Sequence, residues 1–451
     1  MPNRKAGEII EAVFFIGLAI VMYYCLTGEF RFQVYITYRH AVALLIVACG
    51  CISFLIRPNV SRGIIAVKSS LAFCVPELVV LMVSLFIWSY NQEPINVINR
   101  GLSTNFIYLN NVTAVFAAGV FLYMFGEKGI WYNLVAILTV NLIMIAMIIA
   151  ESGIGPFMRE MATLILTFAE DTGDIIGKAE IHELAFCLGA YLVYMILFPR
   201  KKVWFWVLFL LALFCFVAAF KRIAIGAMMI VIPIGALLRL MAKKKLKRAV
   251  SQIITVLMVG LTAALLIYIA FVKFGLFEML EKIGIDTMSR KELYEWANQF
   301  YEFSPGYIGR GIGFLTYHLQ LEGQQLEKAA DTIHNDFLQY FIDLGFWGYI
   351  IWLLAMHIWR VKYFGRKGNI NAQILAAMLA LWLGIVSSTD NTMHYPLFTT
   401  CMAILVMGQG FQQSVAEKDE QIFGHILPQN NPEGRADDLK QEKKVIGSEG
   451  S

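Results

Sequence analysis

Three basic side chains, Arg222, Arg290 and His334, have the chemistry to bind a phosphate ester and to accept a proton from a hydroxyl group. Arginine presents a planar fork of N–H donors that fits the oxygen atoms of a phosphate. Histidine is the side chain best suited to take up a proton near neutral pH. Arg290 and His334 lie in a largely polar stretch of an otherwise apolar chain, and Arg222 lies between two apolar segments. Polar and cationic residues at such places beside a bilayer cost free energy unless something uses them.

Arg290 lies in the first turn of a predicted helix. Ser289 and Glu292 have the spacing of a capping box, which predicts a helix from Ser289 to about Phe303, before Pro305. The free N–H groups and the dipole of a helix N-terminus favour an anion, and an arginine there would strengthen that preference. The alternative is a solvated arginine on an ordinary surface helix.

Lys221 and Arg222 form a cationic pair in a tight turn between two apolar segments. Cations are rare in loops on the external side of membrane proteins, so we interpret the pair as a phosphate site. The alternative is that both side chains reach external lipid headgroups. Glu183, next to His182 at the external start of another segment, could pair with Arg222 or act on a substrate, and structural pairing is the default.

His334 precedes Asn335 and Asp336 at the start of a long apolar segment. Asn335 or Thr332 can cap the helix of this segment, which would place His334 at the membrane surface. There it could act as a base, and the alternative is an interfacial histidine without a chemical role.

The glycine-rich stretch 309–313 is a further point where the backbone could approach a ligand, with Arg310 inside it. It lacks the preceding strand and the spacing of a nucleotide-binding fingerprint. The alternative is a flexible loop.

Composition places the chain among membrane proteins with several spans. Hydrophobic residues make up 58% and charged residues 16% of 451 positions. The net charge of +4 is small and gives no reason to expect a nucleic-acid partner. All seven cysteines fall in apolar runs, which argues against a disulfide framework and a cysteine metal site. The first apolar run lacks a convincing cleavage site, so we interpret it as a retained helix.

We predict an all-α polytopic membrane protein with about twelve transmembrane helices and a helical external loop domain. Each predicted span has roughly the length that a bilayer requires. The predicted spans are 9–26, 40–56, 70–90, 106–125, 130–150, 181–198, 203–220, 223–240, 250–272, 335–358, 371–388 and 396–411.

Loop charges predict the orientation, because cytoplasmic loops carry an excess of lysine and arginine. Four clusters alternate with the other loops, which places them and both termini in the cytoplasm. The clusters begin at Arg57, Arg200, Lys243 and Arg360. The external side then holds 151–180, with an interfacial or re-entrant helix at 161–168, the large loop 273–334, and the loop 389–396. We predict a transmembrane domain over 1–411 and a disordered cytoplasmic tail over 412–451.

The motifs at the end of the large loop resemble those of a known family. The run Ser-Pro-Gly-x-x-Gly-x-Gly-x-Gly-Phe at 304–314 precedes His-Asn-Asp-Phe-Leu-Gln at 334–339 and Leu-Gly-Phe-Trp-Gly at 344–348. Together they resemble the bacterial O-antigen polymerase and ligase superfamily, which includes the Wzy-like polysaccharide polymerases. The cationic pair at 221–222 and the His-Glu-Leu at 182–184 also resemble it, so the resemblance covers roughly 180–410.

The resemblance implies a GT-C-like membrane glycosyltransferase that takes a glycan from a polyprenyl pyrophosphate outside the cytoplasmic membrane, with no metal or other cofactor. By position, Arg222 and Arg290 match the arginines thought to hold the pyrophosphate, and His334 matches a proposed base. Lys221 is a further candidate for binding the pyrophosphate. Many relatives have glycine where this chain has Ser289, so the alignment of Arg290 is the less secure. Further candidates for substrate binding are Arg310, Asn335, Asp336, Glu183, His182 and Tyr294.

Three functions remain open. The first is a polymerase of polysaccharide repeat units with polyprenyl-linked donors, for O-antigen, capsule or exopolysaccharide, with a chain-length regulator protein as a candidate partner. The second is a ligase that moves a finished glycan to a lipid or protein acceptor. The third is a transporter, against which we find no internal repeat of the kind that transporters have.

The proposed role of His334 predicts a pH dependence. Because the neutral imidazole would be the working form, we expect activity to fall as the pH is lowered and the ring takes up a proton. The pH–rate profile of the purified enzyme measures this, and a flat profile would remove His334 from the role of base.

Overall fold

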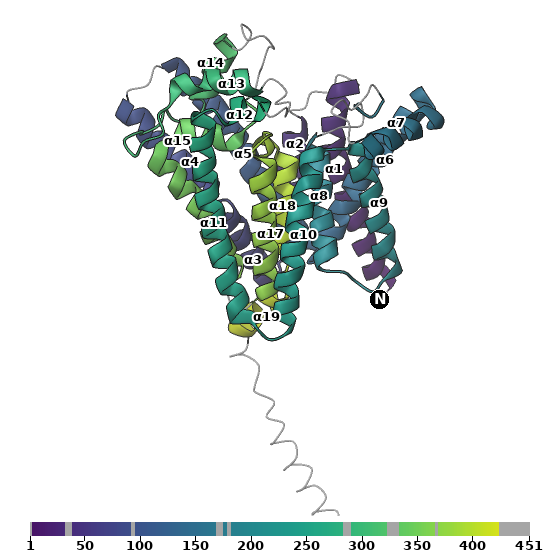
Figure 1. Ribbon diagram of the computed structural model, residues 1–451. Coiled ribbons are helices and arrows are strands. Elements are labelled where there is room, and N and C mark those ends of the chain that lie inside the picture. Colours follow the sequence, from purple (N-terminus) through teal and green to yellow (C-terminus); the bar gives the residue numbers. More distant parts are fainter. Residues whose placement is uncertain are drawn as a thin grey trace, which may run out of the picture.

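The structure is a computed structural model, which describes residues 2–31, 38–91, 95–167, 175–177, 182–282, 290–322, 333–365 and 369–423. Within these ranges the regular elements are helices, as the sequence predicts (Figure 1). The helices of the apolar body are α1 (Pro2–Arg31), α2 (Tyr38–Ile56), α3 (Val60–Phe73), α4 (Val75–Asn91), α5 (Ile95–Phe125), α6 (Lys128–Ser152), α8 (His182–Leu197), α9 (Val203–Ala219), α10 (Arg222–Lys243), α11 (Lys247–Lys273), α15 (Asp336–Leu353), α16 (Arg360–Phe364), α17 (Ile370–Val386) and α18 (Pro396–Gly408).

The body is that of a membrane protein with several spans. Six helices of the described part are long and apolar enough to cross a membrane, or seven if the bent pair α3 and α4 is one span. Five shorter apolar helices, 110–125, 183–197, 203–219, 370–386 and 396–408, lie where the sequence predicts the other spans. The expected number of about twelve therefore divides into six or seven spans of full length and five shorter helices.

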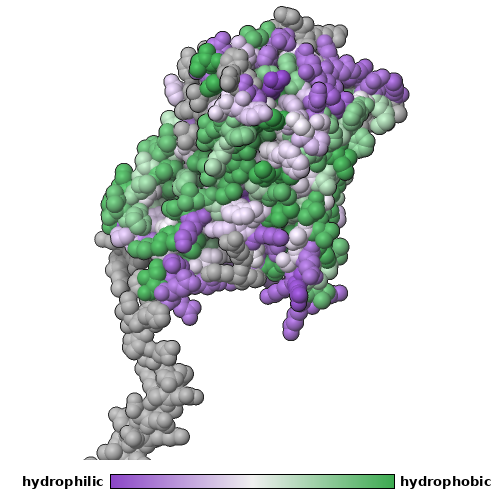
Figure 2. Space-filling view, turned by 90° about the vertical axis from the view of Figure 1, so that its left-hand side faces the viewer, coloured by the Kyte–Doolittle hydropathy of each residue, from purple (hydrophilic) through white to green (hydrophobic). Residues whose placement is uncertain are grey.

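The outer surface of the body is apolar. Large hydrophobic side chains such as Leu55 and Val203 are 80% and 82% exposed. Figure 2 shows that exposed apolar residues form a broad band between two hydrophilic ends. Burying such a band in lipid is favourable at about 25 cal/mol per Å² of apolar surface, so the band indicates the part of the protein that lies in the membrane.

The two ends of the body carry different elements. Helices α12 (Leu276–Lys282), α13 (Arg290–Ala297) and α14 (Phe314–Glu322) lie together at one end, and the N-terminus and α19 (Phe411–Phe423) lie at the other (Figure 1). Arg57, Arg62 and Arg200, from two of the predicted cytoplasmic clusters, line an open pocket with Glu8 of α1 and Gln412 of α19. These clusters thus share one end of the molecule, opposite the large loop.

Two segments differ from the sequence prediction. The first residues of the predicted disordered tail form α19, which packs its buried Phe411 and Val415 against the body. The sequence prediction missed this helix because its apolar face is small and most of its residues are polar. Burial of that face is sufficient to pack the helix against the body. The rest of the tail lies outside the described residues. Helix α7 (Ile154–Thr167) begins before the predicted 161–168 helix and points outward from the bundle (Figure 1).

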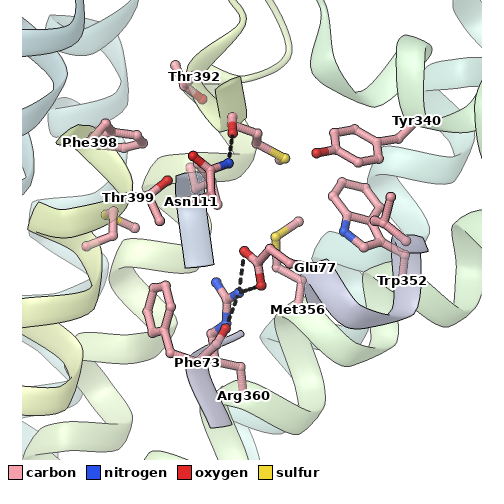
Figure 3. Close-up of a pocket in the computed structure, with 14 residues that line it drawn as sticks. Phe73, Glu77, Asn111, Tyr340, Trp352, Met356, Arg360, Thr392, Phe398 and Thr399 are labelled. Carbon is pink, nitrogen blue, oxygen red and sulfur yellow. Dashed lines mark hydrogen bonds and ion pairs between the residues drawn. The ribbon is translucent and has the colours of Figure 1, made fainter. Parts of the chain in front are cut away.

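A buried ion pair connects α4 to α16. Arg360 Nη2 lies 3.4 Å from both carboxylate oxygens of Glu77 and donates a hydrogen bond of 2.8 Å to the Phe73 carbonyl at the end of α3. The guanidinium therefore satisfies a carbonyl that the break between α3 and α4 leaves without a helical partner. Figure 3 shows this pair below a small cavity of about 40 Å³, which Thr392 and Asn111 line from the opposite side.

The glycine-rich stretch packs against a break in α15. Gly309, Gly311 and Gly313 have φ angles of 96°, 80° and 89°, and Gly345 inside α15 has a φ of 71°. The Gly311 N–H donates to the Asp343 carbonyl at 2.7 Å. These glycines thus let one part of the chain approach another closely, which differs from both sequence interpretations, a flexible loop and a backbone cradle for a ligand.

We predict that Gly309→Ala destabilises the protein and that Gly306→Ala does not. A Cβ at position 309 would lie 2.4 Å from the Gly345 nitrogen in a left-handed backbone, whereas at 306 the nearest atom is 3.5 Å away. The first change should cost more than about 1 kcal/mol and lower the melting temperature in detergent. Equal melting temperatures for the two variants would contradict this packing.

Candidate active site

The candidate site is built around the loop that joins α17 to α18, residues 387–395, which we call the 387–395 loop. Its polar residues are unusually buried, since Ser387 and Thr392 are 0% exposed and Asp390 is 4% exposed. The hydroxyl groups of Ser387 and Thr392 share a hydrogen bond. Buried polar groups need partners, and the partners of this loop come from three distant parts of the chain.

Asp336, in the first turn of α15, holds one side of the loop. Its Oδ2 accepts a hydrogen bond of 2.9 Å from the Met393 N–H, and its own N–H donates to the Ser387 carbonyl at 3.1 Å. Its Oδ1 lies 3.5 Å from His394 Nε2. Burial lowers the pKa of His394 to about 4, so the ring is neutral at neutral pH and the contact is polar rather than ionic. His394 is therefore a poor proton acceptor there.

Lys221 reaches the loop from the turn between α9 and α10. Phe220 adopts a left-handed conformation with a φ of 41°, which makes the turn tight, as predicted. The Lys221 Nζ lies 3.4 Å from Asp390 Oδ2, and the two side chains are only 16% and 6% exposed. Arg222 follows as the first residue of α10. The cationic pair thus lies at the end of the body that carries α13.

Arg290 reaches the same loop from the large loop domain. It begins the described part of α13, and its Nη2 donates to the Thr389 carbonyl at 3.1 Å. Ser289 lies outside the described residues. Helix α13 ends at Ala297 and a 3-10 turn ends at Phe300, before the predicted Phe303.

The early end of α13 has a physical reason. Lys273, at the end of α11, donates hydrogen bonds of 2.6 Å and 2.7 Å to the carbonyls of Asn298 and Tyr301. A helix leaves its last carbonyls without internal partners, and here an ammonium group from outside the segment supplies partners. The Asn298 carbonyl therefore has a hydrogen-bond partner without a further turn of helix.

The backbone of His334 contacts α13, the helix that Arg290 begins. Tyr294, four residues after Arg290 on α13, donates from its hydroxyl to the His334 carbonyl at 3.3 Å. Burial raises the pKa of Tyr294, so its hydroxyl keeps the proton that it donates. His334 itself is exposed and has a φ of 51°. Its side chain is thus exposed at the point where its backbone contacts α13.

Asn335 is the N-cap of α15, as the sequence predicts. Its Oδ1 accepts from the Leu338 N–H at 3.0 Å, and its Nδ2 donates to the Tyr268 hydroxyl at 2.9 Å. Thr332, the other predicted cap, lies outside the described residues. Asn335 and Asp336 therefore fix the start of α15 to α11 and to the 387–395 loop. Because His334 directly precedes them, its backbone position is fixed as well.

Some residues that the sequence predicted for the site have other partners in the structure. Glu183 pairs with Arg39 at 2.9 Å, not with Arg222, and its Oε1 accepts from the Leu397 N–H at 2.8 Å. His182 begins α8 beside it. Arg310 is exposed, with its guanidinium 5.5 Å from the centre of the Phe314 ring. Glu183 thus forms a structural ion pair, as expected, but its partner is Arg39 rather than Arg222. Arg39 belongs to α2, to which the sequence prediction assigned no role at the site.

Thr389, Asp390 and Tyr268 are positions at the candidate site that the sequence prediction did not assign. The sequence places 389–396 on the external side, but nothing in its spacing shows that it contacts both 221 and 290. The signal that could have identified this loop is Asp390, because a carboxylate directly after an apolar span is costly unless it has a partner. Among the described residues, no group of three or more His, Cys, Asp or Glu side chains is arranged to hold a metal ion.

The arrangement is suited to an anion. Lys221, from the turn before α10, and Arg290, of α13, approach one loop at the end of a membrane-embedded body, and the backbone of His334 contacts α13. Fixed cations in a partly buried site attract phosphate groups more strongly than in water. The site can therefore hold a phosphate-bearing group beside a candidate proton acceptor.

One family model matches part of the chain. The family model Wzy_C, described as O-antigen ligase, matches residues 207–353. The matched range begins in α9 and ends with α15, so it includes Lys221, Arg222, Arg290 and His334 but not the 387–395 loop. No curated protein matches the chain.

We predict that the double variant Arg290→Cys and Thr389→Cys, in a background without the native cysteines, is joined by a short bifunctional thiol reagent. The hydrogen bond between these residues requires their backbones to be close. Mass spectrometry after proteolysis detects the product. The control is Arg290→Cys with Arg62→Cys, which lie at opposite ends of the body; equal yields for both pairs would contradict the convergence.

Proposed function

We propose that this chain, whose residues 207–353 match the family model described as O-antigen ligase, polymerises polysaccharide repeat units carried on polyprenyl pyrophosphate. The family is one of membrane enzymes that transfer glycans, in the inner membrane of bacteria. The finer proposal concerns the donor, the reaction and the residues. The observation that carries it is the contact of one loop with both Lys221 and Arg290, beside His334.

In the proposed reaction the acceptor hydroxyl oxygen bonds to the anomeric carbon of the donor sugar. The bond from that carbon to the diphosphate oxygen breaks, and its electron pair stays on the diphosphate. The proton of the hydroxyl passes to His334, which later returns it to solvent. Sugar transfer has an oxocarbenium-like transition state in which the leaving group gains negative charge.

Lys221, Arg222 and Arg290 stabilise that charge. Their cationic groups would contact the diphosphate oxygens, and fixed donors at the point where charge develops lower the barrier without rearranging. The N-terminus of α10, where Arg222 is the first residue, adds the positive end of the helix dipole. A diphosphate is already a good leaving group, so these contacts are sufficient for the chemistry that we propose.

The site would face the outside of the membrane. The pocket at the other end contains arginines from two loops together with residues of α1 and α19, and arginine-rich loops favour the cytoplasm. The end that carries Arg290 and His334 is then external. A polyprenyl chain could lie along the apolar band of Figure 2 while its diphosphate enters the site.

We predict that Arg222→Ala, Arg290→Ala and His334→Ala each abolish long polymer while the protein remains in the membrane. Loss of one transition-state donor should lower kcat by about 100-fold or more. Gel analysis of the polysaccharide, with immunoblotting of membranes, measures this. The matched control is Lys291→Ala, because Lys291 follows Arg290 but pairs with Glu281 at 3.2 Å. Near-normal chain length in all three variants would refute the proposal.

A second candidate is a ligase, since the matching family model carries that description. A ligase would use the same site with a different acceptor. In a deletion strain, accumulation of single repeat units supports the polymerase, and accumulation of long polymer still on its carrier supports the ligase.

A further inference from the structure

We propose that Asp390 is a positioning residue that lowers the affinity of the cationic site for the diphosphate product and so speeds product release. This inference rests on the proposed function. The inference starts from an ion pair. Among the described contacts, Asp390 is the carboxylate that lies next to a cation of the site. Asp390 Oδ2 lies 3.4 Å from Lys221 Nζ.

Asp390 is held in place on its other side. Its Oδ1 accepts hydrogen bonds of 2.8 Å from the Asn391 N–H and 3.1 Å from the Tyr395 hydroxyl. Its side chain is 6% exposed. A carboxylate fixed in this way cannot turn away when an anion arrives, so its charge remains part of the site.

Asp390 also has a role before a ligand binds. Lys221 is adjacent to Arg222, and Arg290 binds the neighbouring Thr389 carbonyl, so three cations gather around one loop. Like charges in a partly buried place repel with little screening. The carboxylate offsets that repulsion and keeps the Lys221 ammonium near the loop.

The donor and the product differ in charge. In the donor, the terminal phosphate is bonded to the sugar. When the bond from the sugar carbon to oxygen breaks, that oxygen stays on the phosphate as a new ionisable group, whose pKa is about 6. The product therefore carries roughly one more negative charge at neutral pH. Cations alone would hold the product more tightly than the donor, and a fixed carboxylate opposes the additional charge.

The expected result is opposite to that of simple damage. Asp390→Asn should bind inorganic pyrophosphate about five- to tenfold more tightly than the wild type at low ionic strength. Its kcat should fall because product leaves slowly, while the KM for donor does not rise. A residue that only supports the fold would instead raise KM or weaken pyrophosphate binding when changed.

The experiment uses the full chain in lipid nanodiscs, with inorganic pyrophosphate as the probe in isothermal titration calorimetry. Tyr395→Phe is the matched control, since it removes a hydrogen bond to Asp390 without changing the charge. It should bind pyrophosphate as the wild type does. Tighter binding by Asp390→Asn alone supports the inference, and equal or weaker binding overturns it while leaving the proposed function intact.

A double-mutant comparison covers the case in which Asp390→Asn does not fold. Lys221→Met removes a cation and should weaken pyrophosphate binding, and adding Asp390→Asn to it should restore binding several-fold. No restoration overturns the inference. If the wild type binds neither inorganic pyrophosphate nor a polyprenyl pyrophosphate, the proposed function fails as well.

Discussion

The hydrogen bonds between Asp336 and the 387–395 loop are the interaction on which the site depends. Asp336 begins α15, directly after His334 and Asn335, and its carboxylate and N–H both contact the loop. The same loop binds Lys221 through Asp390 and Arg290 through Thr389. Three parts of the chain, which include Lys221, Arg290 and Asp336 and lie about 45 to 115 residues apart along the sequence, therefore meet because one short loop gives each of them a buried polar partner.

The breaks in the spanning helices serve the same arrangement. A helix in lipid must satisfy its backbone groups internally, so each break needs a local partner. Arg360 supplies one for the end of α3. The N–H groups of Arg310 and Gly311 and the Tyr307 carbonyl supply others at the interruption of α15 around Gly345. The result is a rigid frame below the loop, with a small cavity between the frame and the loop (Figure 3).

Much of the fold could be predicted from the sequence, because the apolar segments and charged loops of a membrane protein follow from lipid alone. The cap at Asn335 and the tight turn at Lys221 were also predictable, since each depends on neighbouring residues. The partners of Glu183, Asp390 and Arg290 were not predictable. They depend on which spans pack together, and neither hydropathy nor short spacing contains that information. The end of α13 was misplaced for the same reason, because Lys273 comes from another helix.

The most direct measurement is a cryo-electron microscopy map of the protein in nanodiscs with a polyprenyl diphosphate bound. The proposal predicts diphosphate density within hydrogen-bonding distance of Lys221 or Arg222 and of Arg290, with His334 facing the position of the sugar. Diphosphate density at the opposite end, or against residues remote from the 387–395 loop, would contradict it.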